Sequence, residues 1–292
     1  LENDQFELFF QPRVSVETDD VVGAEDLIRW RRPDGELVSP DAFIPVCEET
    51  GLIVPLGAWV LEASIEYQRR LKTLGRDLTI SVNVSPHQFT TPGFAETLSA
   101  LLATTQCEPE RLELEITESM IVKDDQSNLE LLERIRAIGF GLAIDDFGTG
   151  YSNLVYLQAF PITSLKIDKS FIQTIGSNRS VAGLVMSFSR VRGVKAVAEG
   201  GETDAQLGWL RGEGCAEYQG FLFSRPLARD GFEKLIGLQA AAYRIGERGV
   251  DAVYCVGAMF RPVKTGSPAT FGKFSRNAAA AAAGRTEMKP CG

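Results

Sequence analysis

The sequence of 292 residues has little histidine and no closely spaced cysteines. His87 is the one histidine, and the five cysteines are scattered along the chain. Zinc sites are built from clustered histidine and cysteine, and disulfide frameworks need an ordered set of cysteine pairs. The sequence therefore excludes a zinc ribbon and a disulfide-stapled fold, and reduced thiols are expected.

Long apolar runs and a secretory leader are also missing. No apolar stretch approaches the roughly 20 residues that span a bilayer, and residues 1–10 lack the basic and then apolar layout of a signal peptide. We therefore expect a cytoplasmic protein with no membrane contact in this fragment. The chain begins at Leu1 without an initiator methionine, so upstream domains are expected to precede it.

Positive charge is in deficit. Lysine and arginine number 30 against 39 aspartates and glutamates, which gives a net charge of −9. Residues 236–292 hold eight basic and three acidic side chains, which leaves −14 on residues 1–235. Because such an acidic body repels polyanions, a nucleic acid polymer is not an expected partner. An anionic substrate could still bind through metal ions held by the carboxylates.

The sequence does have an alternation of short β-rich runs and longer segments with helical spacing, up to about residue 235. Repeated βα units imply a mainly parallel sheet, and about eight strands in this length favour an α/β barrel that closes on itself. The first two strands are joined by too few residues for a helical crossover, so they should form an antiparallel hairpin. Strands are predicted at 6–16, 21–30, 78–85, 111–119, 141–147, 164–171, 194–201 and 216–223, and helices at 40–50, 57–74, 87–105, 127–139, 179–193 and 204–214.

Beyond residue 235 the pattern decays. We assign residues 1–235 to one domain and residues 236–292 to a C-terminal appendage. The appendage has a short apolar stretch, then glycine, proline and serine, then an alanine run, which is typical of a low-complexity or partly disordered segment. A docking helix at 232–245 is the structured alternative.

Acidic and amide side chains gather where the predicted strands end. In a barrel of parallel strands, chemistry collects at the C-terminal ends of the strands. One charged residue there is usually only solvated, but burying several carboxylates is costly unless they are paired or bind metal. The residues found there are Glu25, Asn83, Glu115, Asp145, Asp146, Lys166, Glu199, Glu202 and Gln219.

The excess of carboxylates over cations predicts a metal site. One lysine cannot neutralise six carboxylates, and oxygen ligands suit Mg²⁺ or Mn²⁺ better than zinc. At a strand end, one member of the adjacent pair Asp145 and Asp146 can bridge two ions while the other binds the second ion, an arrangement known for phosphodiester hydrolysis. A helix N-cap is the alternative for this pair. The glycine-rich residues that follow lack the lysine of a phosphate loop and are expected to form a mobile lid.

Taken together, these motifs resemble the EAL family of cyclic di-GMP phosphodiesterases, whose defining tripeptide reads Glu25-Asp26-Leu27 here. The similarity covers roughly residues 5–235 and includes, in order, FFQP, LIRW, FIPVCEETGLI, SVNVS, LELEITES, AIDDFGTGYSNL, LKIDKSFI, AEGGET and YQGFLFSRPL. The resemblance implies a TIM-like (β/α)8 barrel with an irregular start. It also implies an enzyme, a hydrolase that opens cyclic di-GMP to linear pGpG with Mg²⁺ or Mn²⁺, two ions per active site.

The resemblance assigns metal ligands residue by residue. Glu25, Asn83, Glu115 and Asp145 look like the ligands of one ion. Asp145 would bridge to a second ion, which Asp146 would hold. Ca²⁺ should inhibit such a site, because its larger radius and looser geometry place water and phosphate poorly.

The resemblance also assigns catalytic and substrate-binding residues. Lys166 would position the attacking water, and Glu199 would be either the general base or a second-metal ligand. Arg29 would bind a phosphate, a surface ion pair being the alternative, and Asp168 would contact substrate or form a structural salt bridge. The remaining assignments are Gln11 as a substrate contact, Gln219 close to the water and metals, and Glu202 as the anchor of the glycine-rich loop.

Two positions depart from the family pattern. Asp26 replaces the usual alanine, and Gly201 stands where valine is common. If Glu25 points into the barrel mouth, Asp26 should point toward the helical layer, where a small apolar side chain is expected. We therefore predict lower stability, and not lost metal binding, from Asp26. Gly201 should loosen the backbone between Glu199 and Glu202.

The alternative to an enzyme is a catalytically inactive domain that binds cyclic di-GMP, or a partner protein, without cleavage. Degenerate family members of that kind usually lose acidic ligands or the glycine-rich loop, and here all of these are present. The resemblance further implies a homodimer, and an upstream regulatory or GGDEF domain in the full-length protein.

Overall fold

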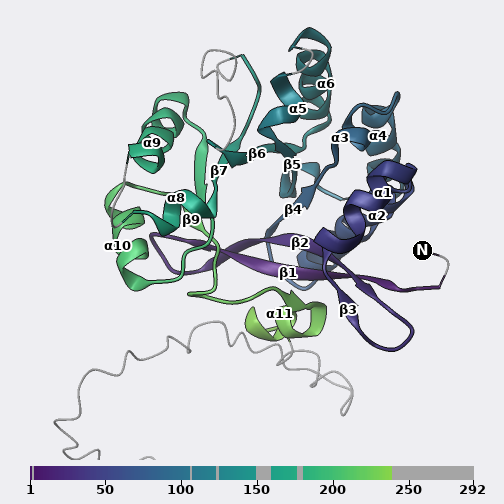
Figure 1. Cartoon of the computed structure of the whole chain (residues 1–292), viewed down its shortest axis with the longest axis horizontal. Coiled ribbons are helices and arrows are strands. Elements are labelled where there is room, and N and C mark those ends of the chain that lie inside the picture. The colour runs from purple at the N-terminus through teal and green to yellow at the C-terminus, as the bar shows by residue number, and fades with distance from the viewer. Residues whose placement is uncertain (2, 106, 123–124, 149–158, 176–179, 239–292) are drawn as a thin grey trace, which may run out of the picture. The chain divides into compact units, whose positions relative to one another are not determined.

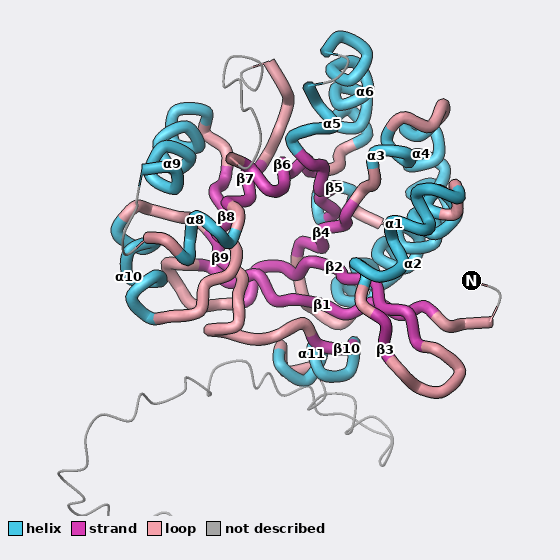
Figure 2. Tube along the Cα trace, viewed as in Figure 1, coloured by secondary structure: helices cyan, strands magenta, loops and turns pink. Residues whose placement is uncertain are grey.

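Eight strands close into a ring in this computed structural model (Figure 2). They pair in the order β1, β9, β8, β7, β6, β5, β4 and β2, and β2 pairs again with β1. Two-residue strands, β3 and β10, pair with β2 and β1 outside the ring. The strands are β1 (Phe6–Ser15), β2 (Val21–Arg31), β3 (Leu37–Val38), β4 (Thr79–Asn83), β5 (Leu112–Thr117), β6 (Gly141–Phe147), β7 (Ser164–Ile167), β8 (Lys195–Ala198), β9 (Glu217–Tyr218) and β10 (Leu227–Ala228).

The first strand runs against its neighbours. β1 is antiparallel to both β2 and β9, whereas every other pairing around the ring is parallel. In the β1–β2 hairpin Gln11 lies opposite Glu25, and Arg13 lies opposite Gly23. The predicted TIM-like barrel with an irregular start is thus confirmed.

Helices cover the outside of the ring (Figure 1). The structure describes residues 1, 3–105, 107–122, 125–148, 159–175 and 180–238, all within the compact unit Leu1–Glu247. Among the described helices, none combines the length and apolar character needed to cross a membrane. The helices are α1 (Pro40–Thr50), α2 (Ile53–Thr73), α3 (Pro86–Phe89), α4 (Phe94–Thr105), α5 (Glu118–Val122), α6 (Asp125–Ile138), α8 (Lys169–Gln173), α9 (Ser180–Arg192), α10 (Asp204–Gly212) and α11 (Arg229–Leu235), with one 3-10 turn, η1 (Pro109–Arg111).

The helix predicted at 87–105 is wrong as a single element. It is divided into α3 and α4, because Pro92 disfavours helical backbone before it and Gly93 adopts φ 82°, which lies in the left-handed region. The sequence pattern did not predict the short helices α5 and α8. The alternative docking helix at 232–245 overlaps α11, and its part from residue 239 onward lies outside the described residues.

Side chains alternate along the parallel strands between a helix-facing apolar side and a polar barrel interior. Ile80 and Val82 of β4 are buried in the main apolar core, while Ser81 between them is bonded to Glu113 of β5. The same period of two gives each strand one apolar and one polar face. The apolar face packs against the helices. The polar face therefore points into the barrel.

The interior polar residues form two layers. We call the lower set the floor layer; its members are Arg13, Ser81, Glu113, Ser164 and Glu217, which are all buried and hydrogen-bonded to one another. We call the upper set the mouth layer. Its members lie near or just past the C-terminal ends of the parallel strands, except Glu25, which lies midway along β2 where the pairing with β4 ends. The mouth layer consists of Glu25, Asn83, Glu115, Asp145, Lys166, Glu199 and Gln219.

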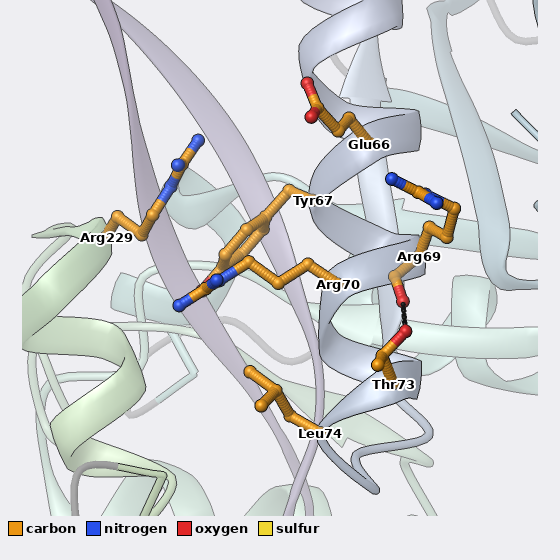
Figure 3. Close-up of a pocket in the computed structure, with 7 residues that line it drawn as sticks. All are labelled: Glu66, Tyr67, Arg69, Arg70, Thr73, Leu74 and Arg229. Carbon is orange, nitrogen blue, oxygen red and sulfur yellow. Dashed lines mark hydrogen bonds between the residues drawn. The ribbon is translucent and has the colours of Figure 1, made fainter. Parts of the chain in front are cut away.

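A pocket of about 370 Å³ lies outside the barrel, where α2 meets α11 (Figure 3). Arg70 of α2 binds Glu233 of α11, with Nε 3.0 Å from Oε1 and Nη2 3.3 Å from Oε2. The guanidinium of Arg229 lies over the Tyr67 ring, 5.2 Å from its centroid. These contacts link α11 to α2.

Candidate active site

Lys166 is the centre of the mouth layer. Its side chain is 1% exposed, and its Nζ lies 2.5 Å from Glu115 Oε2 and 2.7 Å from Glu199 Oε1. Asp145 Oδ1 lies 3.1 Å and Glu25 Oε2 3.3 Å from the same nitrogen. Four carboxylates from four different strands or strand ends thus converge on one ammonium group.

Two amides complete the cluster around Glu25. Asn83 Nδ2 donates to Glu25 Oε1 at 2.8 Å, and Gln219 Nε2 donates to Glu25 Oε2 at 2.6 Å. Gln219 Nε2 also lies 3.3 Å from Glu199 Oε1. The amides therefore fix the Glu25 carboxylate from both sides, and the Asn83 and Gln219 carbonyl oxygens are left to accept hydrogen bonds or bind a cation.

The carboxyl groups around Lys166 differ in the direction of their pKa shifts. Burial opposes ionisation of Glu25, yet Lys166 and the two amide donors hold its pKa below the usual value. Burial and the nearby Glu25 charge raise the pKa of Glu115 well above its usual value. Burial also raises the pKa of Glu199 to about 7, against the attraction of Lys166. One ammonium therefore does not satisfy the cluster electrostatically.

The donor set fits hard divalent cations. Glu115 Oε1 and Gln219 Oε1 are buried and have no hydrogen-bond partner within the described part of the chain. One ligand oxygen each from Asp145, Asp146 and Glu199 lie within 4.8 Å of one another. Unpaired buried oxygens, an excess of negative charge and all-oxygen chemistry are the features that Mg²⁺ or Mn²⁺ would satisfy.

The adjacent acids Asp145 and Asp146 reach the same cluster because β6 is irregular at its end. The β6–β7 register shifts between Ile144 and Phe147, and Asp146 adopts φ 52°. Its backbone N–H donates to Asp145 Oδ1 at 3.0 Å. The left-handed residue breaks the strand alternation that would otherwise send the two carboxylates to opposite faces.

Three residues outside the mouth layer were expected to contact substrate, namely Gln11, Arg29 and Asp168. Gln11 lies opposite Glu25 in the hairpin, and the Arg29 guanidinium lies over the Phe9 ring, 5.5 Å from its centroid. Arg29 Nη1 also donates to Ile28 O at 2.9 Å, so its phosphate role and its ion-pair alternative both stay predictions. Asp168 caps α8, since its Oδ1 accepts from Ser170 N at 3.0 Å.

The glycine-rich loop is held at its start by a residue that the sequence analysis missed. Buried Glu118 accepts a hydrogen bond from Gly148 N at 3.3 Å through Oε2. The signal was the acid three residues after Glu115 in LELEITES. Glu202, the expected anchor, is exposed; residues 149–158 of the loop lie outside the described residues, so its role stays a prediction.

Comparison with known proteins gives a consistent result. The family model described as EAL domain matches residues 1–226. The chain is 40% identical over 239 residues to the signaling protein YkoW of Bacillus subtilis (strain 168), covering 81% of this chain and 30% of the relative. It is also 40% identical over 231 residues to the bifunctional diguanylate cyclase/cyclic di-GMP phosphodiesterase MucR of Pseudomonas aeruginosa, covering 78% of this chain and 34% of the relative. The chain thus spans about a third of the length of these curated relatives.

Solved structures resemble the same part of the chain. The PaMucR phosphodiesterase in complex with c-di-GMP superposes with a TM-score of 0.76 at 38% identity, covering 79% of this chain and 95% of that chain. The EAL enzyme Bd1971 in its cAMP- and cyclic-di-GMP-bound form superposes with a TM-score of 0.76 at 33% identity, covering 80% of this chain and 65% of that one.

Proposed function

The chain belongs to the EAL domain family, and from that membership and the mouth-layer geometry we propose that it is a metal-dependent phosphodiesterase that hydrolyses cyclic di-GMP to linear pGpG. The observation that carries this proposal is the convergence of four carboxylates on Lys166, with two amides orienting Glu25. A domain that only bound nucleotide would not need this costly concentration of buried acids. The relatives and solved structures named for cyclic di-GMP supply the substrate class.

Two Mg²⁺ or Mn²⁺ ions would be held by the acids and the amide of the mouth layer. Glu25, Asn83, Glu115 and Asp145 would bind one ion, and Asp145 with Asp146 would bind the other. When bound, the ions would acidify water and stabilise charge on the phosphoryl oxygens. The proximity of Glu199 to both aspartates leaves it two possible roles, as a ligand of the second ion or as the general base.

Hydrolysis adds one water across a phosphodiester bond of the ring. The water oxygen bonds to phosphorus, the bond from phosphorus to the ribose 3′ oxygen breaks, and that oxygen takes up a proton. Glu199, whose pKa is raised by burial to about 7, can accept the proton of the attacking water. Lys166 would supply positive charge beside the phosphate, and Gln219 would orient Glu25 and Glu199, since its Nε2 donates to both carboxylates.

Substrate contacts would come from the long β1–β2 hairpin and the neighbouring strand ends. Arg29 is suited to a phosphate because its planar fork matches two phosphate oxygens. Gln11 lies opposite Glu25 on the adjoining strand and would contact the nucleotide. Asp168 holds the start of α8 through Ser170, so any contact with substrate would be made from a fixed position.

The wider organisation belongs to the same proposal. Residues 1–235 would be the phosphodiesterase domain and 236–292 an appendage, although buried Ile236 and Leu238 pack into the barrel core and favour a slightly later boundary. An upstream regulatory or GGDEF domain is in keeping with the bifunctional name of the MucR relative. We also propose a homodimer and a cytoplasmic location.

The test is to incubate the purified chain with cyclic di-GMP and Mg²⁺ or Mn²⁺ and separate the products by chromatography. We expect linear pGpG, no product after chelation of the metal, and inhibition by Ca²⁺. Tight binding of cyclic di-GMP without product would instead make the domain a receptor and would overturn the enzymatic proposal.

A further inference from the structure

Arg13 of β1 is a buried arginine that the proposed hydrolysis leaves unused. Its side chain is 1% exposed. Nε and Nη2 donate to Glu217 Oε2 at 2.9 and 2.6 Å, and Nη1 donates to Glu113 Oε2 at 2.5 Å and to the Ser81 hydroxyl. One guanidinium therefore ties β1 to β9, β5 and β4 across the inside of the barrel.

The network of Arg13 reaches two further strands. Ser164 Oγ of β7 donates to Glu113 Oε1 at 2.7 Å, and Lys195 Nζ of β8 donates to Glu217 Oε1 at 3.1 Å. Burying a guanidinium and two carboxylates is often no more stabilising than an apolar core of the same volume. Stability alone therefore does not explain the buried charges of the floor layer.

Four floor residues, Ser81, Glu113, Ser164 and Glu217, each lie two positions before a mouth-layer residue in the sequence. Residues i and i+2 of a strand share a face and stand about 7 Å apart along it, so the height of the lower residue sets the height of the upper one. On β1, Arg13 is two residues from Gln11, which lies opposite Glu25. The pairs on the parallel strands are Ser81 with Asn83, Glu113 with Glu115, and Ser164 with Lys166. Gln219 follows Glu217 just past the end of β9, where its N–H still bonds to Ala198 O of β8 at 2.8 Å.

We propose that Arg13 is a positioning residue of the active site, which holds β5 and β9 in the register that places Glu115 and Gln219 for metal binding and catalysis. This inference rests on the proposed function, because it concerns the same metal and substrate site. Arg13 acts through Glu113 and Glu217 and touches neither substrate nor metal. Its guanidinium has the planar, multiply donating geometry that a lysine lacks.

The test compares Arg13→Lys with Arg70→Lys in the full chain. Arg70 is the matched control, because it forms an arginine–glutamate pair with Glu233 on the outside of the barrel. Mn²⁺ affinity without nucleotide is measured by calorimetry, kcat and KM for cyclic di-GMP are measured separately, and thermal unfolding reports stability. We expect Arg13→Lys to lower Mn²⁺ affinity and kcat about tenfold with little change in KM, and Arg70→Lys to change none of the three.

A folded Arg13→Lys protein with wild-type Mn²⁺ affinity and kcat, but a lower melting temperature, would show a merely structural role and overturn the proposal. If Arg13→Lys does not fold, Ser164→Ala removes one donor to Glu113 without leaving a charge unpaired. It should lower Mn²⁺ affinity in the same direction, and an unchanged affinity would again overturn the proposal. The Mn²⁺ readout needs no turnover, so a wild-type protein that binds Mn²⁺ without cleaving cyclic di-GMP would refute the proposed function while still testing Arg13. A wild-type protein that binds no Mn²⁺ would refute both.

Discussion

Ser64 of α2 donates a hydrogen bond to the buried carboxyl group of Asp26 on β2. Asp26 is 2% exposed and points to the helical layer, whereas its neighbour Glu25 points into the barrel mouth. The sequence predicted this opposition from strand alternation. Burial raises the pKa of Asp26 to about 8, with Ser64 opposing that rise.

Asp26→Ala should stabilise the protein, by about 1–3 kcal/mol at pH 8. The folded state keeps the Asp26 proton up to about pH 8, whereas an unfolded aspartate loses it near pH 4. Between these values folding takes up a proton, so the stability of the parent falls as pH rises, and the alanine variant lacks this slope. Ser64 is not orphaned, because its hydroxyl is already 2.8 Å from Val60 O.

Denaturant unfolding of both proteins at pH 5 and pH 8 measures this effect. The stability gap should widen with pH, while Mn²⁺ affinity stays the same. An equal gap at the two pH values, or a less stable alanine variant, would refute the account of Asp26.

Glu115→Gln should separate stability from metal binding. The glutamine replaces a carboxyl group whose ionisation is opposed by burial and by Glu25, and an amide needs no ionisation there, so the metal-free protein should be at least as stable as the parent. The same change removes a ligand charge, so Mn²⁺ affinity should fall about tenfold or more. Thermal melts with and without Mn²⁺ report both quantities. A variant that loses stability without metal and keeps its Mn²⁺ shift would contradict the metal assignment.

Gly201→Ala should stabilise the protein by about 0.4–1 kcal/mol, because it reduces the freedom of the unfolded chain. A Cβ at this position would meet only Tyr218 Cδ2, at 3.4 Å. Gly220 is the matched control, because a Cβ there would lie 2.2 Å from Gly201 O, so Gly220→Ala should destabilise. Chemical denaturation ranks the two variants, and a loss of stability in Gly201→Ala would mean that the glycine is needed where the family has valine.

Much of the barrel mouth could be predicted from sequence, because strands end where their apolar alternation ends and parallel strands end at one edge. Glu25, Glu115 and Asp145 were found in this way, and they meet around Lys166. The floor layer was missed although Glu113 shares a face with Glu115. A single acid in an apolar strand does not reveal its partner, and Arg13 lies 100 residues away from Glu113 in sequence.

The local hydrogen bonds of Asp168 and Glu118 could not be predicted from the sequence. Asp168 could be read as a substrate contact or an ion-paired residue, but its Oδ1 caps a helix of five residues that is too short to show a periodic pattern. Glu118 begins a helix of the same length and reaches Gly148 through the fold, a contact between residues that no motif spacing predicts.

The measurement that tests the account most directly is the initial rate of pGpG formation from cyclic di-GMP with saturating Mn²⁺, for the wild type and for Glu25→Gln. Glu66→Gln on the exposed side of α2 is the control with the same chemical change. We predict product from the wild type and an undiminished rate in Glu66→Gln. In Glu25→Gln the rate should fall by a factor of about 100 or more. A Glu25→Gln protein as active as the wild type, or a wild type that binds Mn²⁺ and cyclic di-GMP and forms no pGpG, would contradict it.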